Sequence, residues 1–179
     1  MPIKIEKASV KKMKLKLGFG ALRQLRGYLA EYIAACAFSR WMEEKYPELK
    51  ELKEMGPFFP WNPNINIWIP PPRPVVRHPT SKWVLNELVM PELRPIKRIL
   101  DKGGGYPDLV ASVRLGEGKE EKYFIEVKSG DARLDERQKL SMVLAKEEGY
   151  IPVIVRVRSM DVKGNEFDVE ITELAVRSS

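Results

Sequence analysis

Two acidic residues and a lysine stand at a spacing that suits metal and phosphate chemistry. Asp108 begins one short apolar segment, and Glu126 and Lys128 lie in the next one, residues 122–128. Side chains alternate along a strand, so Glu126 and Lys128 share one face. The charged connection 115–121 contains two glycines and predicts a hairpin, which brings Asp108 beside Glu126. Because hard divalent cations prefer carboxylate oxygens, these residues predict a magnesium and phosphate site at the end of a sheet.

The pattern Glu-x-Lys carries little information by itself, because it occurs six times in the chain. Only Glu126 lies within an apolar strand, where an ionisable pair is costly unless each charge has a partner or a metal. The alternative is an ordinary Glu-Lys pair at the end of a strand. The dipeptide Pro107-Asp108, one hairpin earlier, favours a functional site.

Length and composition describe a protein with a single core. The chain has 179 residues, of which 44% are hydrophobic and 31% are charged, so one domain over residues 1–179 is expected. No apolar segment approaches the roughly 20 residues needed to cross a bilayer, and no secretory leader is recognisable. We therefore expect a cytoplasmic protein with no membrane partner. Fourteen prolines and only two glutamines are compatible with a thermophilic source.

Cysteine and histidine are each present once, as Cys36 and His78. This count excludes an intrachain disulfide and a thiolate zinc cluster. Cys36 lies among alanines and is predicted to be a small core residue. The kind of metal site that remains possible is one built from acidic side chains.

The charge of the chain is concentrated at its start. The net charge is +6, and residues 1–26 contain eight Lys or Arg against one acid. Such a basic arm favours a polyanionic partner; the alternatives are a disordered solubilising tail and, more weakly, a membrane-binding segment. The candidate nucleic-acid-binding residues are Lys11, Lys12, Lys14, Lys16, Arg23, Arg26, Arg73, Arg77 and Arg133.

The first half of the chain predicts a basic arm or edge strand at residues 1–20 and a long first core helix at 21–46. Glu31 is the only charge between residues 27 and 39 of a helix that is apolar nearly all round. It is either a third acid facing the metal site or a rim glutamate paired with Arg23 or Arg26.

Residues 55–80 form a distinct insertion that holds eight of the prolines together with several aromatic residues. Its arginines and aromatic rings suit base stacking or phosphate binding, and the alternative is a dimerisation or packing loop. Within it, residues 64–69 alternate like a strand.

The second half predicts a helix at about 80–89, an edge strand at Ile96–Leu100, and a glycine run at 103–105 that leaves room for a phosphate or acts as a hinge. The sheet and helix of a catalytic core are expected within residues 95–158. A final strand and tail are expected at 159–179.

Gln138 lies in the first turn of a helix expected over Leu134–Glu148. It has the spacing of a capping box with Asp135, which would give it a structural role. The alternative is that its amide points at Lys128 or at the scissile phosphate.

Taken together, Glu31, Pro107-Asp108, Glu126-Val127-Lys128 and Gln138 resemble the PD-(D/E)XK nuclease superfamily, both in residue type and in element order. The resemblance is to archaeal Holliday-junction resolvases and to RecB-like and VRR-type nucleases, and it covers residues 20–45 and 95–158. It implies an α/β fold with a restriction-endonuclease-like αβββαβ core. In that core a mixed central sheet is flanked by helices, and here the Pro- and aromatic-rich insertion is added to it.

The resemblance also implies a mechanism and partners. Asp108, Glu126 and the main-chain carbonyl of Val127 would bind Mg²⁺ or Mn²⁺, with Glu31 completing the shell directly or through water. Lys128 would orient or deprotonate the attacking water, and Gln138 would assist. The expected activity is hydrolysis of duplex, branched or single-stranded DNA by a homodimeric endonuclease of recombination, repair or replication.

Two other classes stay open. One is a nucleic-acid-binding protein that keeps the nuclease fold without catalysis, and the other is a protein-interaction module that uses the Pro-rich insertion. Among nucleases, the sequence does not separate a junction resolvase from a restriction-like endonuclease or an exonuclease.

Overall fold

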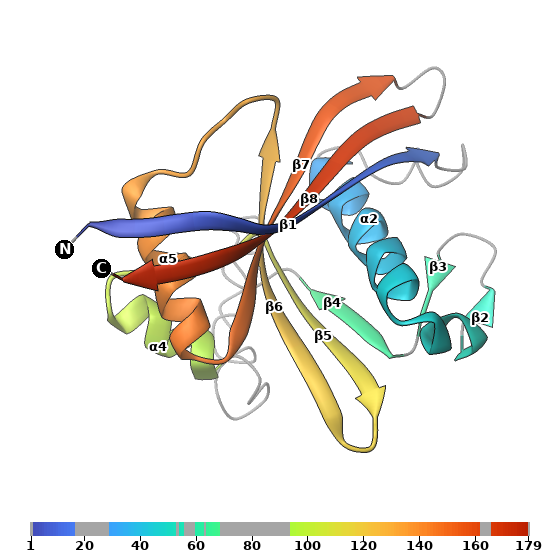
Figure 1. Cartoon of the computed structure of the whole chain (residues 1–179), viewed down its shortest axis with the longest axis horizontal. Helices are drawn as coiled ribbons and strands as arrows, with labels where there is room; N and C mark the ends of the chain where they lie inside the picture. Colours follow the sequence, from blue (N-terminus) through green and yellow to red (C-terminus); the bar gives the residue numbers. More distant parts are fainter. Residues whose placement is uncertain are drawn as a thin grey trace, which may run out of the picture.

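The computed structural model describes residues 2–16, 29–52, 54–55, 60–62, 64–68, 94–161 and 166–178, whose main feature is a six-stranded sheet (Figure 1). In spatial order its strands are β1 (Ile3–Lys16), β8 (Glu166–Ser178), β7 (Tyr150–Asp161), β6 (Lys119–Ser129), β5 (Leu109–Gly116) and β4 (Ile65–Trp68). The β6–β7 pair is parallel, and the other neighbouring pairs of this sheet are antiparallel. The predicted α/β class with a mixed central sheet is confirmed.

Helices cover both faces of this sheet (Figure 1). Helix α2 (Leu29–Lys45) packs on one face, and α4 (Arg94–Asp101) and α5 (Glu136–Glu147) pack on the other. After α2, a 3-10 helix η1 (Pro47–Leu52) leads to a small two-stranded sheet of β2 (Glu54–Met55) and β3 (Pro60–Trp61).

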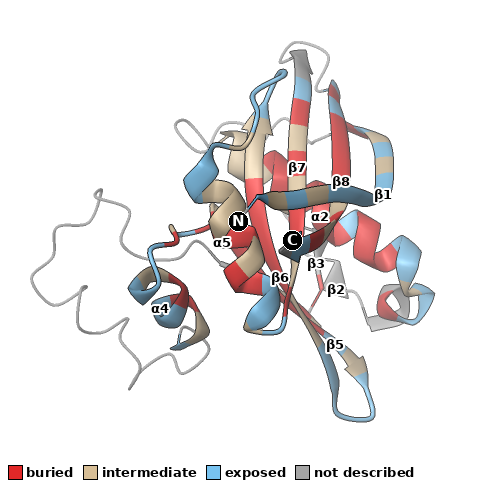
Figure 2. Ribbon diagram, turned by 60° about the vertical axis from the view of Figure 1, so that its left-hand side comes forward, coloured by how far each residue is buried: buried red, intermediate tan, exposed pale blue. Residues whose placement is uncertain are grey.

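The alternation of β6 divides its side chains between two hydrophobic cores. Tyr123 and Ile125 are buried in the core beneath α2, where Phe38 packs edge-on against Tyr123 with ring centroids 4.9 Å apart. Phe124 belongs to the core beneath α4 and α5. Glu126 and Lys128 therefore lie on the α5 side of the sheet, as the alternation predicted. Figure 2 shows the buried residues concentrated along the middle of the sheet.

Helix α2 is buried on more than one side, as its composition predicted. Its buried residues include Ala34, Ala37 and Phe38, and the small alanines let the helix pack closely on the sheet. Cys36 is buried among them, and burial raises the pKa of its thiol to about 11. This confirms the interpretation of Cys36 as a core residue.

The edge strand predicted at Ile96–Leu100 is wrong, because this segment lies within α4. Ile96 and Ile99 are three residues apart and buried, whereas Lys97 and Arg98 between them are exposed. That spacing fits one face of a helix. The strand that pairs with β5 is instead β4, inside the predicted insertion, with Ile65 opposite Val113.

Of the two interpretations of the first 20 residues, a basic arm or an edge strand, the structure supports the edge strand, because residues 3–16 form β1 at the edge of the sheet. Its partner is β8, with Ile3 opposite Ser178 and Lys16 opposite Glu166. The predicted C-terminal tail is likewise strand almost to its end. Each of the two terminal segments supplies the backbone hydrogen-bond partners that the other needs.

Other predictions are confirmed or fall outside the described residues. The hairpin between β5 and β6 and the helix α5 are confirmed with slightly shifted bounds. The start of the first helix at 21–28 and the helix predicted at 80–89 lie outside the described residues. Within the described ranges, no helix is long and apolar enough to cross a membrane.

Candidate active site

Asp108 is held at the start of β5, next to β6. Leu109 lies opposite Ile125 in the antiparallel register, which places Asp108 beside Glu126. The main-chain N–H of Val127 donates a hydrogen bond to Asp108 Oδ2 at 2.8 Å. This contact fixes one carboxylate oxygen, and the hairpin brings the two acids together as the sequence predicted.

Glu126 is a buried carboxyl group, with 7% of its surface exposed. Burial, and next the negative charge of Asp108, raise the pKa of Glu126 to about 8, and Lys128 opposes this rise. A hydrogen bond between the two carboxyl groups contributes to the same rise. Paired carboxyl groups of this kind either share a proton or bind a cation, because two adjacent negative charges repel each other.

Lys128 is joined to Glu126 mainly through Gln138. Lys128 Nζ donates to Gln138 Oε1 at 2.8 Å, and Gln138 Nε2 donates to Glu126 Oε1 at 2.5 Å. The direct distance from Lys128 Nζ to Glu126 Oε1 is 3.7 Å. The three side chains therefore form one connected polar group on the α5 side of the sheet.

Gln138 also belongs to the capping box of α5. Its main-chain N–H donates to Asp135 Oδ1 at 2.8 Å, and its side-chain Oε1 accepts from the main-chain N–H of Asp135 at 3.0 Å. The two interpretations of Gln138 thus hold together. The helix start fixes the amide that contacts the site.

The glycine run before Asp108 packs against its surroundings. A side chain at Gly104 would lie 2.6 Å from Ile99, so at this position the glycine permits close packing and leaves no room for a phosphate. The main-chain N–H of Gly105 donates to Ser141 Oγ of α5 at 2.7 Å. The connection is tied to α4 and α5, which positions Asp108.

Glu31 lies in the first turn of α2 and is half-buried. Helix α2 packs on the face of the sheet opposite to Glu126 and Lys128. In the described part of the chain, no three or more His, Cys, Asp or Glu side chains are grouped so as to hold a metal. The structure thus brings Asp108 and Glu126 together and does not add Glu31 to them.

The two acids fit a divalent cation by their chemistry. They offer hard oxygen ligands, Glu126 is too buried to carry its charge without a partner, and the carbonyl of Val127 belongs to the same stretch of β6. The residues that would hold such an ion are Asp108, Glu126 and Val127.

The predicted nucleic-acid-binding lysines of β1 divide between its two faces. Lys11 forms an ion pair with Glu44 of α2 at 2.5 Å, so it faces that helix. Lys12 and Lys14 are exposed and lie on the other face. Lys16 ends the strand, and Arg133 is exposed in the loop before α5. Arg23, Arg26, Arg73 and Arg77 lie outside the described residues.

Sequence analysis missed two arginines of β7. Arg156 Nη1 donates to the carbonyls of Gly130 and Ala132, at 2.8 and 2.7 Å, which holds the loop between β6 and α5. Arg158 Nη1 forms an ion pair with Asp131 of the same loop at 3.0 Å. The alternation of β7 puts both on one face, but only the parallel pairing with β6 places that face beside Lys128.

No protein-family model, curated protein or solved structure significantly matches this chain. The function is therefore inferred from the arrangement of the site and the order of the elements around it.

Proposed function

We propose that the protein is a metal-dependent nuclease that hydrolyses phosphodiester bonds in DNA. The observation that carries the proposal is the convergence of Asp108, Glu126, Lys128 and Gln138 at one place beside the sheet. Paired carboxyl groups next to a lysine suit phosphoryl chemistry, because they combine a cation site with a positive charge for the reacting phosphate.

The order of the elements supports the same proposal. Along the chain, α2 is followed by the antiparallel strands β4, β5 and β6, then by α5 and by β7, which is parallel to β6. This order resembles the αβββαβ order expected of a restriction-endonuclease-like core, with α4 added between β4 and β5. The proposed site residues lie at the start of β5, on β6 and on the first turn of α5.

Each acid has a distinct task in the proposed reaction. Asp108 is oriented by the N–H of Val127, which donates to its Oδ2, and its carboxylate would be a ligand of the cation. Glu126 must release its proton to act as a ligand, and Lys128 favours that release. A bound Mg²⁺ or Mn²⁺ supplies polarisation of the phosphoryl oxygen and of a water molecule. Glu31 is not part of the proposed ligand set, because α2 packs on the opposite face of the sheet.

Lys128 is the proposed catalytic cation. The Lys128 ammonium group donates to the side-chain oxygen of Gln138 at 2.8 Å. In this position it can orient the attacking water and offset the charge that develops on the phosphate. Because Gln138 is itself fixed by the helix cap, the lysine is positioned before substrate binds.

The direct test compares the wild type with Asp108→Asn, Glu126→Gln and Lys128→Ala. The substrates are supercoiled plasmid, linear duplex, single strand and a four-way junction, each with Mg²⁺, Mn²⁺ or EDTA. We expect metal-dependent cleavage that all three variants lose. The control is Glu117→Gln, at the exposed tip of the β5–β6 hairpin, which should cleave like the wild type. Failure of the wild type to cleave any substrate would reject the nuclease.

A second candidate is a protein that binds nucleic acid and no longer cleaves it. The exposed lysines Lys12 and Lys14, on the same face as the site, favour it. Binding in EDTA without cleavage in either metal would select this function. The protein-interaction role of the Pro-rich insertion, the homodimer and the cytoplasmic location stay predictions.

A further inference from the structure

A row of polar side chains crosses the sheet from the proposed site to its edge. Lys128 of β6 lies opposite Arg156 of β7. Arg156 lies opposite Glu170 of β8, which lies opposite Lys12 of β1. Directly opposed residues of neighbouring strands point to the same side of a sheet. The row thus connects the catalytic lysine of β6 with the basic edge strand.

The packing of the neighbouring residues shows which side this is. Val155 of β7 is buried in the core beneath α2, so the next residue, Arg156, lies on the opposite face. Leu15 of β1 is buried in the same core, so Lys14 and Lys12 also lie on the opposite face. That face carries Glu126, Lys128 and α5.

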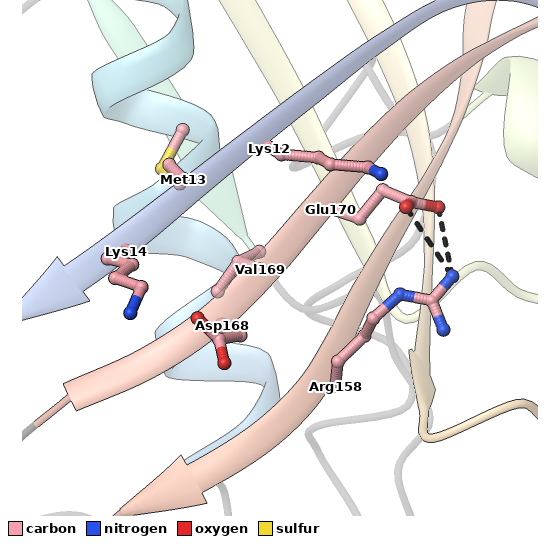
Figure 3. Close-up of a pocket in the computed structure, with 7 residues that line it drawn as sticks. All are labelled: Lys12, Met13, Lys14, Arg158, Asp168, Val169 and Glu170. Atoms are coloured by element: carbon pink, nitrogen blue, oxygen red, sulfur yellow. Dashed lines mark hydrogen bonds and ion pairs between the residues drawn. The ribbon is translucent and has the colours of Figure 1, made fainter.

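This face is hollowed next to the row (Figure 3). The hollow has a volume of about 440 Å³. It is lined by residues of three strands: Lys12, Met13, Lys14, Arg158, Asp168, Val169 and Glu170. In Figure 3, the Lys12, Arg158 and Glu170 side chains gather on one side of the strands, with α2 behind.

The hollow holds three positive side chains, Lys12, Lys14 and Arg158, against two acidic ones, Asp168 and Glu170, and the three positive side chains are exposed. Glu170 is buried, at 6% exposure, and Arg158 Nη2 meets both its carboxylate oxygens at 3.4 Å. Arg158 itself keeps 44% of its side chain exposed. In the part of the chain that the structure describes, no ion pair engages Lys12 or Lys14. Arginine and lysine in this state are suited to phosphate oxygens.

We infer that this hollowed face is a binding groove for the phosphate backbone of a nucleic-acid strand, held by Lys12, Lys14 and Arg158. The inference rests on the proposed function and extends it, because the strand that occupies the groove is the one cleaved beside Lys128. Three strand spacings of about 4.8 Å separate β6 from β1, or about 14 Å. At about 3.4 Å per nucleotide, the lysines contact phosphates on the order of four nucleotides from the scissile one.

The chemistry of the face favours a polyanion over a protein partner. Among the described residues, the large hydrophobic side chains with high exposure are Val10 and Tyr106. Protein interfaces rely on a buried apolar and aromatic centre, which this face does not offer in the described part of the chain. The charges of Lys12, Lys14 and Arg158 instead complement a phosphate backbone.

The test measures the salt dependence of DNA binding in EDTA, which keeps cleavage out of the assay. Fluorescein-labelled single-stranded and duplex oligonucleotides are titrated at several KCl concentrations with the wild type, Lys12→Ala/Lys14→Ala and Arg158→Ala. Each phosphate contact contributes about 0.7 to 0.9 to the slope of log K against log salt concentration. We expect this line to become less steep, by about 1.5 to 2 in Lys12→Ala/Lys14→Ala and by about 1 in Arg158→Ala.

The matched control is Lys4→Ala/Lys7→Ala. It removes the same charge from the same strand, at two exposed positions in the other half of β1. We expect it to keep the wild-type slope, and thermal melting of all variants verifies that they fold.

The possible outcomes separate this inference from the nuclease proposal. The groove is overturned if the wild type and Lys12→Ala/Lys14→Ala show equal slopes. It is also overturned if Lys4→Ala/Lys7→Ala loses as much of the slope as Lys12→Ala/Lys14→Ala, or if the wild type binds no DNA. A lowered slope in a protein that never cleaves supports the groove and rejects the nuclease. Cleavage together with an unchanged slope supports the nuclease and rejects the groove.

Discussion

The side-chain amide of Gln138 donates to Glu126 at 2.5 Å, so the first turn of α5 is linked directly to the buried acid of β6. The oxygen of the same amide accepts from the main-chain N–H of Asp135, and the Gln138 main-chain N–H donates to Asp135 Oδ1, which completes the capping box. Folding of the helix and assembly of the site therefore depend on one side chain. This relationship allows the structural and the functional role of Gln138 to be measured separately.

Gln138→Ala and Asp135→Ala should have similar effects on stability and different effects on cleavage. Each removes one half of the capping box, which costs about 1 kcal/mol of unfolding free energy. Only Gln138→Ala frees Lys128 and Glu126 from their shared partner, so we expect at least a tenfold loss of cleavage rate in that variant alone. Urea unfolding and single-turnover cleavage measure the two effects. An equal loss of cleavage in Asp135→Ala would show that the cap accounts for the effect.

Glu126→Gln should make the protein more stable at high pH. Burial and Asp108 raise the pKa of Glu126 from its ordinary value of 4.5 to about 8. The folded state then binds this proton more tightly than the unfolded state. The free energy of unfolding therefore falls as pH rises between about 5 and about 8. Glutamine has no proton to lose, so the gain over the wild type should be small at about pH 5 and full above about pH 8.

Thermal melting in EDTA at several pH values measures this effect. Glu117→Gln removes an exposed glutamate from the hairpin tip and serves as the control. A Glu126→Gln variant whose melting temperature follows the wild type at every pH would contradict the raised pKa.

A divalent cation should stabilise the folded protein through Asp108 and Glu126. Binding to the folded state alone adds about 2.7 kcal/mol at a concentration of about 100 times the dissociation constant. Because burial and Asp108 raise the pKa of Glu126 to about 8, binding at neutral pH should also release a proton into a weakly buffered solution. Melting with and without Mn²⁺ and a pH-indicator titration measure both effects without any nuclease assay. Asp108→Asn should lose both the stabilisation by Mn²⁺ and the proton release. If both effects persist in that variant, the ion binds elsewhere.

Lys128→Ala should nearly abolish cleavage and leave DNA binding largely intact. The lysine contacts the reacting group in our proposal, whereas most of the binding energy comes from other phosphate contacts. Lys119→Ala, at the exposed other end of β6, removes the same charge and should cleave normally. Wild-type turnover by Lys128→Ala would remove the lysine from the mechanism.

Gly104→Ala should destabilise the protein by about 1 to 3 kcal/mol. A side chain there would lie 2.6 Å from the Ile99 side chain and 3.0 Å from its carbonyl oxygen. The neighbouring change Gly105→Ala is the control, since its new side chain would make ordinary contacts no closer than 3.6 Å. Chemical denaturation compares the two variants. Equal stability would show that the connection before Asp108 adjusts easily.

Sequence alone predicted the local parts of this site. The alternation of residues 122–128 put Glu126 and Lys128 on one face, and the hairpin between β5 and β6 brought Asp108 beside them. Both follow from short-range geometry, because a hairpin fixes the register of its own strands. The capping box of Asp135 and Gln138 is local in the same way.

Tertiary structure decided what depends on distant pairing. Ile96–Leu100 was misread as a strand because a short apolar run does not distinguish a strand from a helix, and only packing against α5 decides between them. The sequence left a basic arm and an edge strand open for the first residues, and the pairing of β1 with β8 decided for the edge strand. The same pairing placed Lys12 on the same row as Lys128. No local pattern contains that information, because the row depends on which strands are neighbours, and neighbours in a sheet are chosen by the burial of the whole core.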